Sequence, residues 1–277
     1  MELAITTDML IEGRHFLPGA DPRLLGHKSV AVNLSDLAAA GATPRWATLA
    51  IAFPAADAAW LAAFSSGMFA LLDRHGVDLV GGDTTRGPLV TINMTAFGEV
   101  PAGAALSRGG ARPGDDIWVS GALGGAALAL LRPDLPGAAR RLHQPEPRVA
   151  LGKRLLGLAH AAIDISDGLA GDLGHVLERS GAGAVVHYER LPKDASFSGL
   201  NDAPLEARCV LSGGDDYELL FTAGQDRRDE LQRMAAQLEL PLSRIGSINA
   251  EREKLVILDP QGRPMAHRGG HDHFAPA

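Results

Sequence analysis

The stretch Leu79–Gly87 reads Leu-Val-Gly-Gly-Asp-Thr-Thr-Arg-Gly, so two strand-forming residues lead into a glycine pair and a run of polar side chains. Paired glycines allow backbone N–H groups to approach an anion closely, and aspartate and threonine oxygens suit a hard cation such as Mg²⁺. The guanidinium of Arg86 can bind two phosphate oxygens at once. An ordinary Gly-Gly-Asp turn is the alternative interpretation, and the choice depends on whether other carboxylates converge on this stretch.

The composition around this stretch is that of an ordinary globular protein. The chain has 277 residues, 46% hydrophobic and 21% charged, which predicts one or two domains with a large core. A formal net charge of −7 argues against electrostatic binding of nucleic acid. The lone Cys209 excludes an intrachain disulfide. No apolar run approaches the roughly 18 residues needed to span a membrane, and the N-terminus lacks a signal sequence, so we expect a cytoplasmic protein without a membrane partner.

The part before residue 101 alternates between predicted strands and helices. Asp21-Pro22 predicts a helix start, and the helix should run to about Ala40 with Asn33 and Asp36 on one face. A second helix should begin after Asp57 and end at Gly76. We expect four strands, at Glu2–Thr7, Trp46–Phe53, Val77–Val80 and Leu89–Val100. A polar loop is expected at Asp8–Gly19, between the first strand and the first helix.

Pro101–Gly114 is rich in proline and glycine and is the predicted domain boundary, which separates residues 1–104 from residues 105–277. Beyond it we expect six strands: Asp116–Ser120, Ala161–Ile165, Ala184–Tyr188, Tyr217–Thr222, Ser243–Ile248 and Lys254–Leu258. Helices are expected at Glu146–His160, Leu169–Arg179 and Arg227–Leu238, with an irregular segment at Leu191–Ala207 and a second Gly-Gly-Asp turn at Leu211–Asp216. This alternation predicts a two-domain α/β or α+β protein.

Acidic and hydroxyl side chains recur where apolar segments end or on apolar helices. The groups are Thr6-Thr7-Asp8, Asn33 with Asp36, Asp83, Asp164 with Asp167, and Asp215-Asp216. Each aspartate could simply cap a helix or a turn, which is its commonest use at such junctions. The other interpretation is that they converge on divalent cations, whose charge makes a crowd of carboxylates tolerable. Five such groups in this context favour the second interpretation.

Other site chemistries have weaker support in the sequence. There is no Gly-x-Ser-x-Gly motif, no pair of cysteines and no Gly-x-x-x-x-Gly-Lys-[Ser/Thr] loop. The histidines His267, His271 and His273 are interpreted as a solvated terminal cluster. Phosphoryl transfer that uses acidic residues and Mg²⁺ is therefore the chemical class that fits best.

Several stretches taken together resemble the thiamine-monophosphate kinase family, within the aminoimidazole ribonucleotide synthetase-like superfamily. They occur in the family's order across nearly the whole chain: Thr6-Thr7-Asp8 with Gly13-Arg14-His15-Phe16, Val32–Gly41, Gly81–Gly87, Ser107–Ala111, Asp164–Leu169, Ser212–Leu219 and Gly270–Phe274. The resemblance implies an N-terminal α/β domain, a C-terminal α+β domain and a homodimer formed through the N-terminal strands. It also implies that ATP phosphorylates thiamine phosphate to thiamine diphosphate with several Mg²⁺ ions.

The resemblance further implies roles for individual residues. The expected metal ligands are Thr6, Thr7, Asp8, Asp36, Asp83, Asp164 and Asp167. The expected ATP contacts are Gly82, Asp83, Arg108 and Ser166. The expected contacts to thiamine phosphate are His15, Asp215 and His271. Asp83, Asp164, Asp167 and Arg108 are expected to act in the phosphoryl transfer itself.

The chemistry of the acceptor predicts direct transfer. A phosphate monoester has a second pKa of about 6 and is mostly ionised near neutral pH, so it needs no general base. The remaining obstacle is the approach of two polyanions, which Mg²⁺ ions and Arg108 would relieve. We therefore expect in-line transfer without a phosphoenzyme.

The sequence departs from the family pattern in three places. The family carries a Gly-Asp-Asp motif upstream of its first strand, and this chain starts after that position. We therefore expect one metal ligand and part of the dimer-forming sheet to be missing. Two explanations are open: the start of the sequence was assigned too late, or the protein is shortened and impaired. His271 replaces an aromatic ring that usually stacks on the substrate, and Asp215 stands where glutamate is common.

Two alternative functions follow from these departures. The first is another phosphoryl-transfer member of the superfamily, although the C-terminal cysteine of the hydrogenase-maturation relatives and the reactive N-terminal cysteine of the selenophosphate relatives are not seen. The second is a homologue that binds nucleotide or thiamine phosphate without turnover. The missing Gly-Asp-Asp supports this second alternative, whereas the retained aspartates oppose it.

Overall fold

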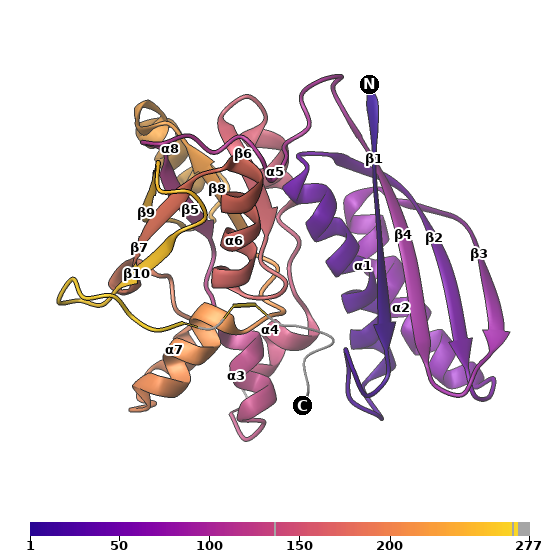
Figure 1. Ribbon diagram of the computed structural model, residues 1–277. Helices are drawn as coiled ribbons and strands as arrows, with labels where there is room; N and C mark the ends of the chain where they lie inside the picture. The colour runs from indigo at the N-terminus through magenta and orange to yellow at the C-terminus, as the bar shows by residue number, and fades with distance from the viewer. Residues whose placement is uncertain (136, 268, 271–277) are drawn as a thin grey trace.

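The computed structural model describes residues 1–135, 137–267 and 269–270, which form two halves that each contain a sheet (Figure 1). In the N-terminal half the order along the sheet is β1-β4-β2-β3, so β1 and β3 are its two edges. The elements of this half are β1 (Glu2–Ile11), α1 (Pro22–Ala39), β2 (Thr43–Phe53), α2 (Ala58–His75), β3 (Asp78–Arg86) and β4 (Thr91–Val100).

The C-terminal half contains a six-stranded mixed sheet in the order β10-β7-β9-β5-β8-β6. Its strands are β5 (Asp116–Ser120), β6 (Ala159–Asp164), β7 (Gly183–His187), β8 (Leu219–Ala223), β9 (Leu242–Asn249) and β10 (Leu255–Leu258). Its helices are α3 (Gly125–Leu131), α4 (Ala139–His143), α5 (Val149–Leu155), α6 (Leu169–Ser180), α7 (Ala203–Ser212) and α8 (Arg228–Gln237), with the short helices η1 (Tyr188–Arg190), η2 (Ala195–Phe197) and η3 (Gln225–Arg227).

The two long N-terminal helices begin and end as the sequence predicts. The Asp21 side chain accepts the N–H groups of Arg23 and Leu24 at the start of α1. Asp57 caps α2 in the same way, and Gly76 ends it in the left-handed conformation with φ of 64°. Both helices pack on one face of the N-terminal sheet, and α1 lies between that sheet and the C-terminal half (Figure 1).

Several expected boundaries are wrong. The strand β1 extends through Asp8 to Ile11, because it pairs with β4 along its whole length and its polar residues belong to the alternating pattern. The expected helix Glu146–His160 is reduced to α5, since β6 already begins at Ala159 to pair with β8. The helix α7 lies partly inside the segment expected to be irregular.

The glycine pair at Gly81-Gly82 lies within a strand, so the expected turn is wrong. β3 continues through Asp83 to Arg86 and pairs in parallel with β2, with a register shift beside Ala47 and Thr48. Gly82 has φ of 152°, and a Cβ atom there would lie 1.9 Å from the carbonyl oxygen of Leu49. The glycine is thus needed for close approach of two strands.

An apolar core joins the two halves. One cluster combines side chains from α1, α2 and the N-terminal sheet with Trp118 and Phe221 of the C-terminal sheet. These two rings are stacked with centroids 6.4 Å apart. Because this cluster contains side chains of both sheets, the two halves are packed directly against each other. None of the helices within the described ranges is long and apolar enough to cross a membrane.

The face of the N-terminal sheet that points away from α1 and α2 is rich in exposed apolar side chains. Successive strand residues point to opposite faces, so β1 buries Leu10 and leaves Ile5 and Met9 exposed at 60% and 50%. We call this surface the outer face. Its exposed apolar residues include Leu3, Ile5, Met9, Trp46 and Val80.

Candidate active site

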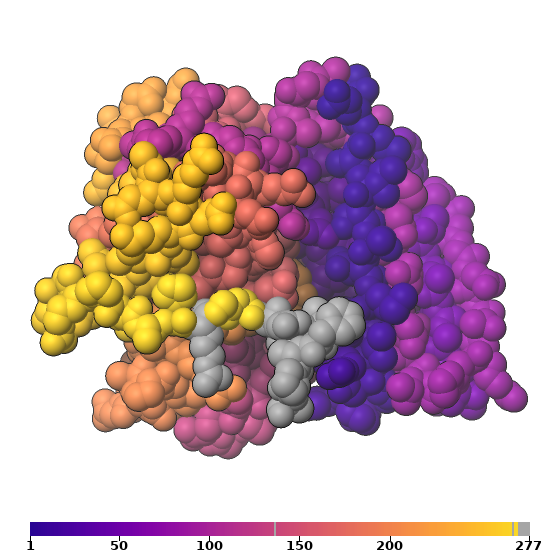
Figure 2. Space-filling view, viewed as in Figure 1, coloured from indigo at the N-terminus to yellow at the C-terminus, as the bar shows by residue number. Residues whose placement is uncertain are grey.

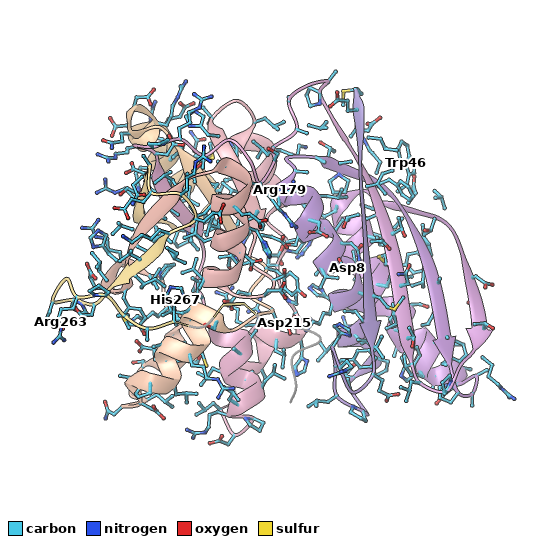
Figure 3. All side chains as sticks on the ribbon, viewed as in Figure 1. Asp8, Trp46, Arg179, Asp215, Arg263 and His267 are labelled. Carbon is cyan, nitrogen blue, oxygen red and sulfur yellow. The ribbon has the colours of Figure 1, made fainter. Side chains whose placement is uncertain are left out.

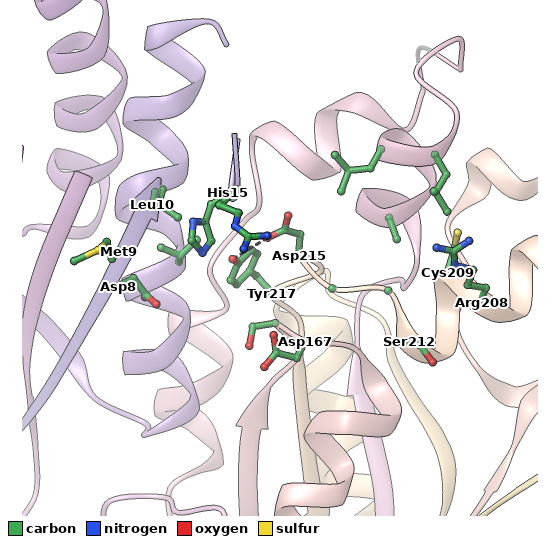
Figure 4. A pocket seen from close by; sticks show the side chains of 18 of the residues that line it. Asp8, Met9, Leu10, His15, Asp167, Arg208, Cys209, Ser212, Asp215 and Tyr217 are labelled. Carbon is green, nitrogen blue, oxygen red and sulfur yellow. Dashed lines mark hydrogen bonds between the residues drawn. The ribbon is translucent and has the colours of Figure 1, made fainter. Parts of the chain in front are cut away.

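A cavity of about 580 Å³ lies where the two halves meet. Figure 3 places Asp8 and Asp215 on opposite sides of this junction, and the space-filling view shows the indigo N-terminal segment along the boundary (Figure 2). The close-up shows His15 and Asp8 of the N-terminal half facing residues of the C-terminal half (Figure 4). The lining includes Thr7, Asp8, Arg14, His15, Ser166, Asp167, Arg208, Asp215 and Tyr217.

Three of the predicted metal ligands gather beside this cavity. The Thr6 hydroxyl donates a hydrogen bond of 2.5 Å to Asp36, and the Ser35 hydroxyl donates one of 2.6 Å to Asp164. Asp164 ends β6 with only 4% of its surface exposed. Burial, and next the negative charge of Asp36, raise its pKa well above the usual range. The α1 helix and the end of β6 therefore bring carboxylates from distant parts of the sequence together.

The carboxylate of Asp8 completes this group from β1. Burial, and next the charge of Asp36, raise its pKa to about 7. Its Oδ2 atom is buried and has no hydrogen-bond partner among the described residues. An unpaired buried carboxylate oxygen is costly, and a cation beside it removes that cost.

The donor chemistry of Asp8, Asp36 and Asp164 fits Mg²⁺. Within residues 1–135, 137–267 and 269–270, however, no three His, Cys, Asp or Glu side chains are arranged to hold a metal ion by themselves. Mg²⁺ is usually bound through one or two carboxylates together with waters and substrate phosphates. These residues can therefore contribute part of a coordination shell, which substrates and further groups would complete.

Two loops of the C-terminal half form the opposite wall: Ser166–Gly168, which follows β6, and Gly213–Glu218, which precedes β8. They are joined by the Asp215 N–H, which donates to the Ser166 carbonyl at 2.9 Å. Asp215 and Tyr217 have φ of 68° and 50°, a left-handed conformation that is uncommon for residues other than glycine. Such backbone conformations cluster at functional sites.

Asp215 is held from two directions. The buried Lys28 ammonium on α1 lies 3.0 Å from its Oδ2 atom, and the Tyr217 hydroxyl donates to Oδ1 at 3.0 Å. The first contact connects the N-terminal half to the Gly213–Glu218 loop of the C-terminal half. Lys28 was not predicted as a site residue, and the signal that the sequence offers is a lysine between the apolar residues Leu25 and Val30 of a predicted helix.

Asp172 on α6 was also missed. It is 2% exposed, and its Oδ2 atom accepts the N–H groups of Ser166, Asp167 and Gly168, each at 3.1 Å. Burial, and next the charge of Asp167, raise its pKa to about 7, although the three hydrogen bonds act in the opposite direction. The carboxylate thereby organises the backbone of a predicted ATP and metal loop.

The far end of the Gly213–Glu218 loop is held by Glu218. This side chain is 1% exposed and accepts hydrogen bonds of 2.7 and 2.5 Å from Arg148 and of 2.6 Å from the Ser120 hydroxyl. The neighbouring Asp216 accepts the Gly124 N–H. Hydrogen bonds satisfy these buried carboxyl groups, and they secure the loop on the C-terminal sheet and its helices.

His15 and Arg108 lie close to this site. The Nδ1 atom of His15 accepts the Ile11 N–H at 3.0 Å, and the side chain lines the cavity. Arg108 is exposed, and its positive charge acts to lower the pKa of Asp36, although burial raises that pKa overall. His271 lies outside the described residues.

Gly82 and Asp83 lie away from the cavity. The cross-strand pairs Met9↔Asn93, Asn93↔Ala50 and Ala50↔Asp83 place Asp83 in one row with Met9, on the exposed outer face. Three strand spacings separate the two residues, which amounts to about 14 Å. The side chain of Asp8 points to the opposite face. Within a single chain, Asp83 is therefore not brought together with Asp8, Asp36 and Asp164.

The sequence and the fold both match known proteins. Residues 1–100 match the AIR synthase related protein N-terminal domain, and residues 112–259 match its C-terminal domain. The thiamine-monophosphate kinase of Salmonella typhimurium is 45% identical, with 99% of this chain and 87% of that protein covered. That of Bacillus subtilis is 30% identical, with 98% and 87% covered.

Solved structures agree with this assignment. Thiamine-monophosphate kinase from Stenotrophomonas maltophilia K279a is 45% identical with a TM-score of 0.90, and the match covers 95% of this chain and 86% of that one. AaThiL complexed with AMPPCP and TMP is 29% identical with a TM-score of 0.85, and the match covers 98% and 87%. The expected two-domain fold is confirmed, and the chain belongs to the thiamine-monophosphate kinases of the AIR synthase-related family.

Proposed function

We propose that this chain transfers the γ-phosphoryl group of ATP to thiamine phosphate, which yields ADP and thiamine diphosphate. Membership in the kinase family supports the reaction, as does the relative that binds AMPPCP and TMP. The observation that carries the proposal is the convergence of Asp8, Asp36 and Asp164 beside a cavity between the two halves.

The residues divide into three roles. Asp8, Asp36, Asp164 and Asp167, with the hydroxyls of Thr6 and Thr7, would hold Mg²⁺ ions, which would supply positive charge to offset that of the phosphates. Ser166 and Arg108 contact ATP, and Arg108 adds positive charge beside Asp36. His15 and Asp215, and with them His271, contact thiamine phosphate.

The transfer is direct. The acceptor phosphate is mostly ionised near neutral pH, so these side chains need only position it in line and screen its charge. Incubation with γ-labelled ATP and Mg²⁺, without thiamine phosphate, should leave the denatured protein unlabelled. A stable phosphoprotein would contradict direct transfer.

A homodimer formed through the outer face would complete the site. The exposed Leu3, Ile5 and Met9 provide an apolar surface suited to a second copy. The cavity borders the edge strand β1 and is lined by Met9 of the outer face as well as by Asp8 of the other face. Gly82 and Asp83 of a second copy can thus approach the ATP and metal site, although their own chain keeps them away from it.

The decisive assay is the formation of thiamine diphosphate from thiamine phosphate, ATP and Mg²⁺ by the purified full chain. Chromatography should resolve the product, and omission of Mg²⁺ should abolish it. The second candidate is a homologue that binds without turnover, which is favoured by the incomplete metal-binding group in the described residues. Calorimetric binding of ATP with no product formation would support this candidate over the kinase.

We also propose that domain 1–104 carries the metal-side strand and the dimer surface, and that domain 105–277 carries the Ser166–Gly168 and Gly213–Glu218 loops. The protein is proposed to act in the cytoplasm without nucleic-acid or membrane partners. The single cysteine, Cys209, is a free thiol, which fits a reducing compartment.

A further inference from the structure

The Ser166–Gly168 loop presents three consecutive backbone N–H groups to a single carboxylate oxygen. The oxygen is Oδ2 of Asp172, and all three donor–acceptor distances are 3.1 Å. The side chain is 2% exposed, so solvent does not compete for these bonds.

Asp172 does not act as an ordinary helix cap. The N-cap of α6 is Gly168, which has φ of 114° and no side-chain capping bond, whereas Asp172 is the fourth residue inside the helix. Helical side chains tilt toward the N-terminus, so this carboxylate reaches back over the preceding loop. It satisfies the N–H groups of Ser166 and Asp167, which lie upstream of the helix.

The same loop is held on its other side. The Ser166 carbonyl accepts the Asp215 N–H at 2.9 Å, and a Cβ atom on Gly168 would lie 2.8 Å from the carbonyl carbon of Ser212. The loop therefore lies between the Gly213–Glu218 loop and α6, and Asp172 is the contact that fixes its amide side. Removal of that contact leaves three buried or half-buried donors without this acceptor.

The charge of Asp172 does not suit substrate binding. The cavity is already lined by the acidic Asp8 and Asp167, and a further negative charge opposes the binding of polyanions. The benefit of a carboxylate here must then come from the shape that it gives the loop.

We infer that Asp172 is a positioning residue, which holds the Ser166–Gly168 loop so that Ser166 can contact ATP and Asp167 can bind Mg²⁺. This inference rests on the proposed roles of Ser166 and Asp167. Asp172 holds the Ser166–Gly168 backbone directly, whereas its link to Asp215 runs only through the Ser166 carbonyl, so the nucleotide side of the reaction should respond most to its removal.

Three variants of the full chain test the inference. Asp172→Ala removes the acceptor, Asp172→Asn keeps one acceptor oxygen without the charge, and Glu178→Gln on the exposed side of α6 is the matched control. Asp172→Ala should raise the KM for ATP and the Mg²⁺ concentration for half-maximal rate roughly 10- to 100-fold, because misplacement by about 1 Å can cost that much. The KM for thiamine phosphate should change less than about threefold, and Asp172→Asn should recover most of the loss.

Two measurements do not depend on turnover. Calorimetry with AMPPCP and Mg²⁺ should show the same loss of affinity in Asp172→Ala and the same recovery in Asp172→Asn. Hydrogen–deuterium exchange at residues 166–168 should be faster in Asp172→Ala than in Glu178→Gln. If the wild-type chain made no thiamine diphosphate, the kinase proposal would fail, while exchange would still test how Asp172 holds the loop.

The outcomes that overturn the inference are distinct. Equal changes in the KM values for ATP and thiamine phosphate would indicate a general structural role. If Asp172→Ala does not fold, the same measurements on Asp172→Asn decide between the positioning role and its alternatives. Suppose that Asp172→Asn folds, shows wild-type hydrogen–deuterium exchange at residues 166–168 and yet no longer binds AMPPCP. This result would show that the charge of Asp172 is required, and not the position that it gives the loop.

Discussion

At the scale of single residues, the site is dominated by carboxyl groups whose burial disfavours the ionised form. Asp8, Asp36 and Asp164 come from β1, α1 and the end of β6, and burial is the first cause of the raised pKa of each. A protein without bound cations must either protonate these groups or bear their repulsion. Their titration therefore links the stability of the protein to pH and to Mg²⁺.

We predict that the metal-free protein loses stability as pH rises from about 4 to about 7. In that window Asp8 keeps its proton in the folded state, because its pKa is about 7, but loses it in the unfolded state. The folded state then binds more protons than the unfolded state. The contribution of Asp8 to the free energy of unfolding therefore falls by up to about 1.4 kcal/mol per pH unit in this window and stays constant above pH 7.

Urea unfolding in EDTA across this range checks the prediction. Asp8→Asn should have a smaller slope and a higher stability at pH 8, and Mg²⁺ should stabilise it less than the wild type. Asp226→Asn, a change at an exposed aspartate, should keep the wild-type slope. An unchanged slope in Asp8→Asn would remove this residue from the group that titrates.

Lys28 gives a second prediction at this scale. Lys28→Met should raise the KM for thiamine phosphate several-fold and lower the free energy of unfolding by about 1.5–3 kcal/mol, because Asp215 loses a charged hydrogen bond. The KM for ATP should stay near the wild-type value. In a double-mutant cycle with Asp215→Asn the two effects should be less than additive. Strict additivity would show that the contact is not used.

At the scale of elements, β3 is the clearest departure from local expectation. The glycine pair that resembles a phosphate-binding turn is part of an edge strand, and β2 lies so close that Gly82 has no room for a side chain. A glycine needed for strand packing and a glycine needed for anion binding look alike in a sequence. The position of the strand separates them.

The two adjacent glycines of β3 should respond differently to alanine. Gly82→Ala places Cβ 1.9 Å from the Leu49 carbonyl oxygen, whereas a Cβ on Gly81 would be 3.9 Å from Thr48. Gly82→Ala should therefore destabilise the protein by roughly 1–3 kcal/mol, and Gly81→Ala by less than about 1 kcal/mol. Thermal unfolding of the matched pair checks this, and equal melting temperatures would contradict the packing argument.

At the scale of the whole molecule, Asp83 lies away from the cavity of its own chain. Its own chain places it about three strand spacings from Met9 and on the face opposite to Asp8. A second copy that packs on the outer face is the arrangement that we propose. The activity of mixed dimers tests this arrangement directly.

We predict that inactive Asp8→Asn and Asp83→Asn chains regain activity when they are mixed and exchanged. If each site takes Asp8 from one copy and Asp83 from the other, random exchange restores roughly a quarter of the wild-type sites. Thiamine diphosphate formation and sedimentation velocity are the measurements.

Introduction of Ile5→Glu on the outer face of both chains should give monomers and prevent the recovery. Phe69→Glu is the control, since it changes an exposed apolar residue of α2. Dimers that exchange without regaining activity would show that Asp83 does not act across the interface.

The sequence by itself determined the family, the long N-terminal helices and the aspartates that carry the chemical hypothesis. Asp21 and Asp57 act on N–H groups two and three residues away, so a local pattern was sufficient to predict both helix starts. The family could be identified for a similar reason: its motifs are short stretches whose order along the chain is visible without a fold.

Only the tertiary structure decided which of these residues meet. Strand pairing places Asp8 and Asp83 on opposite faces of one sheet. The packing of α1 against the C-terminal half brings Lys28 to Asp215 across 187 positions of sequence. Asp172 acquires its three donors because a helix turns it back over the loop before it. Register, face and side-chain direction depend on partners that are remote in sequence, and for that reason no local pattern contains them.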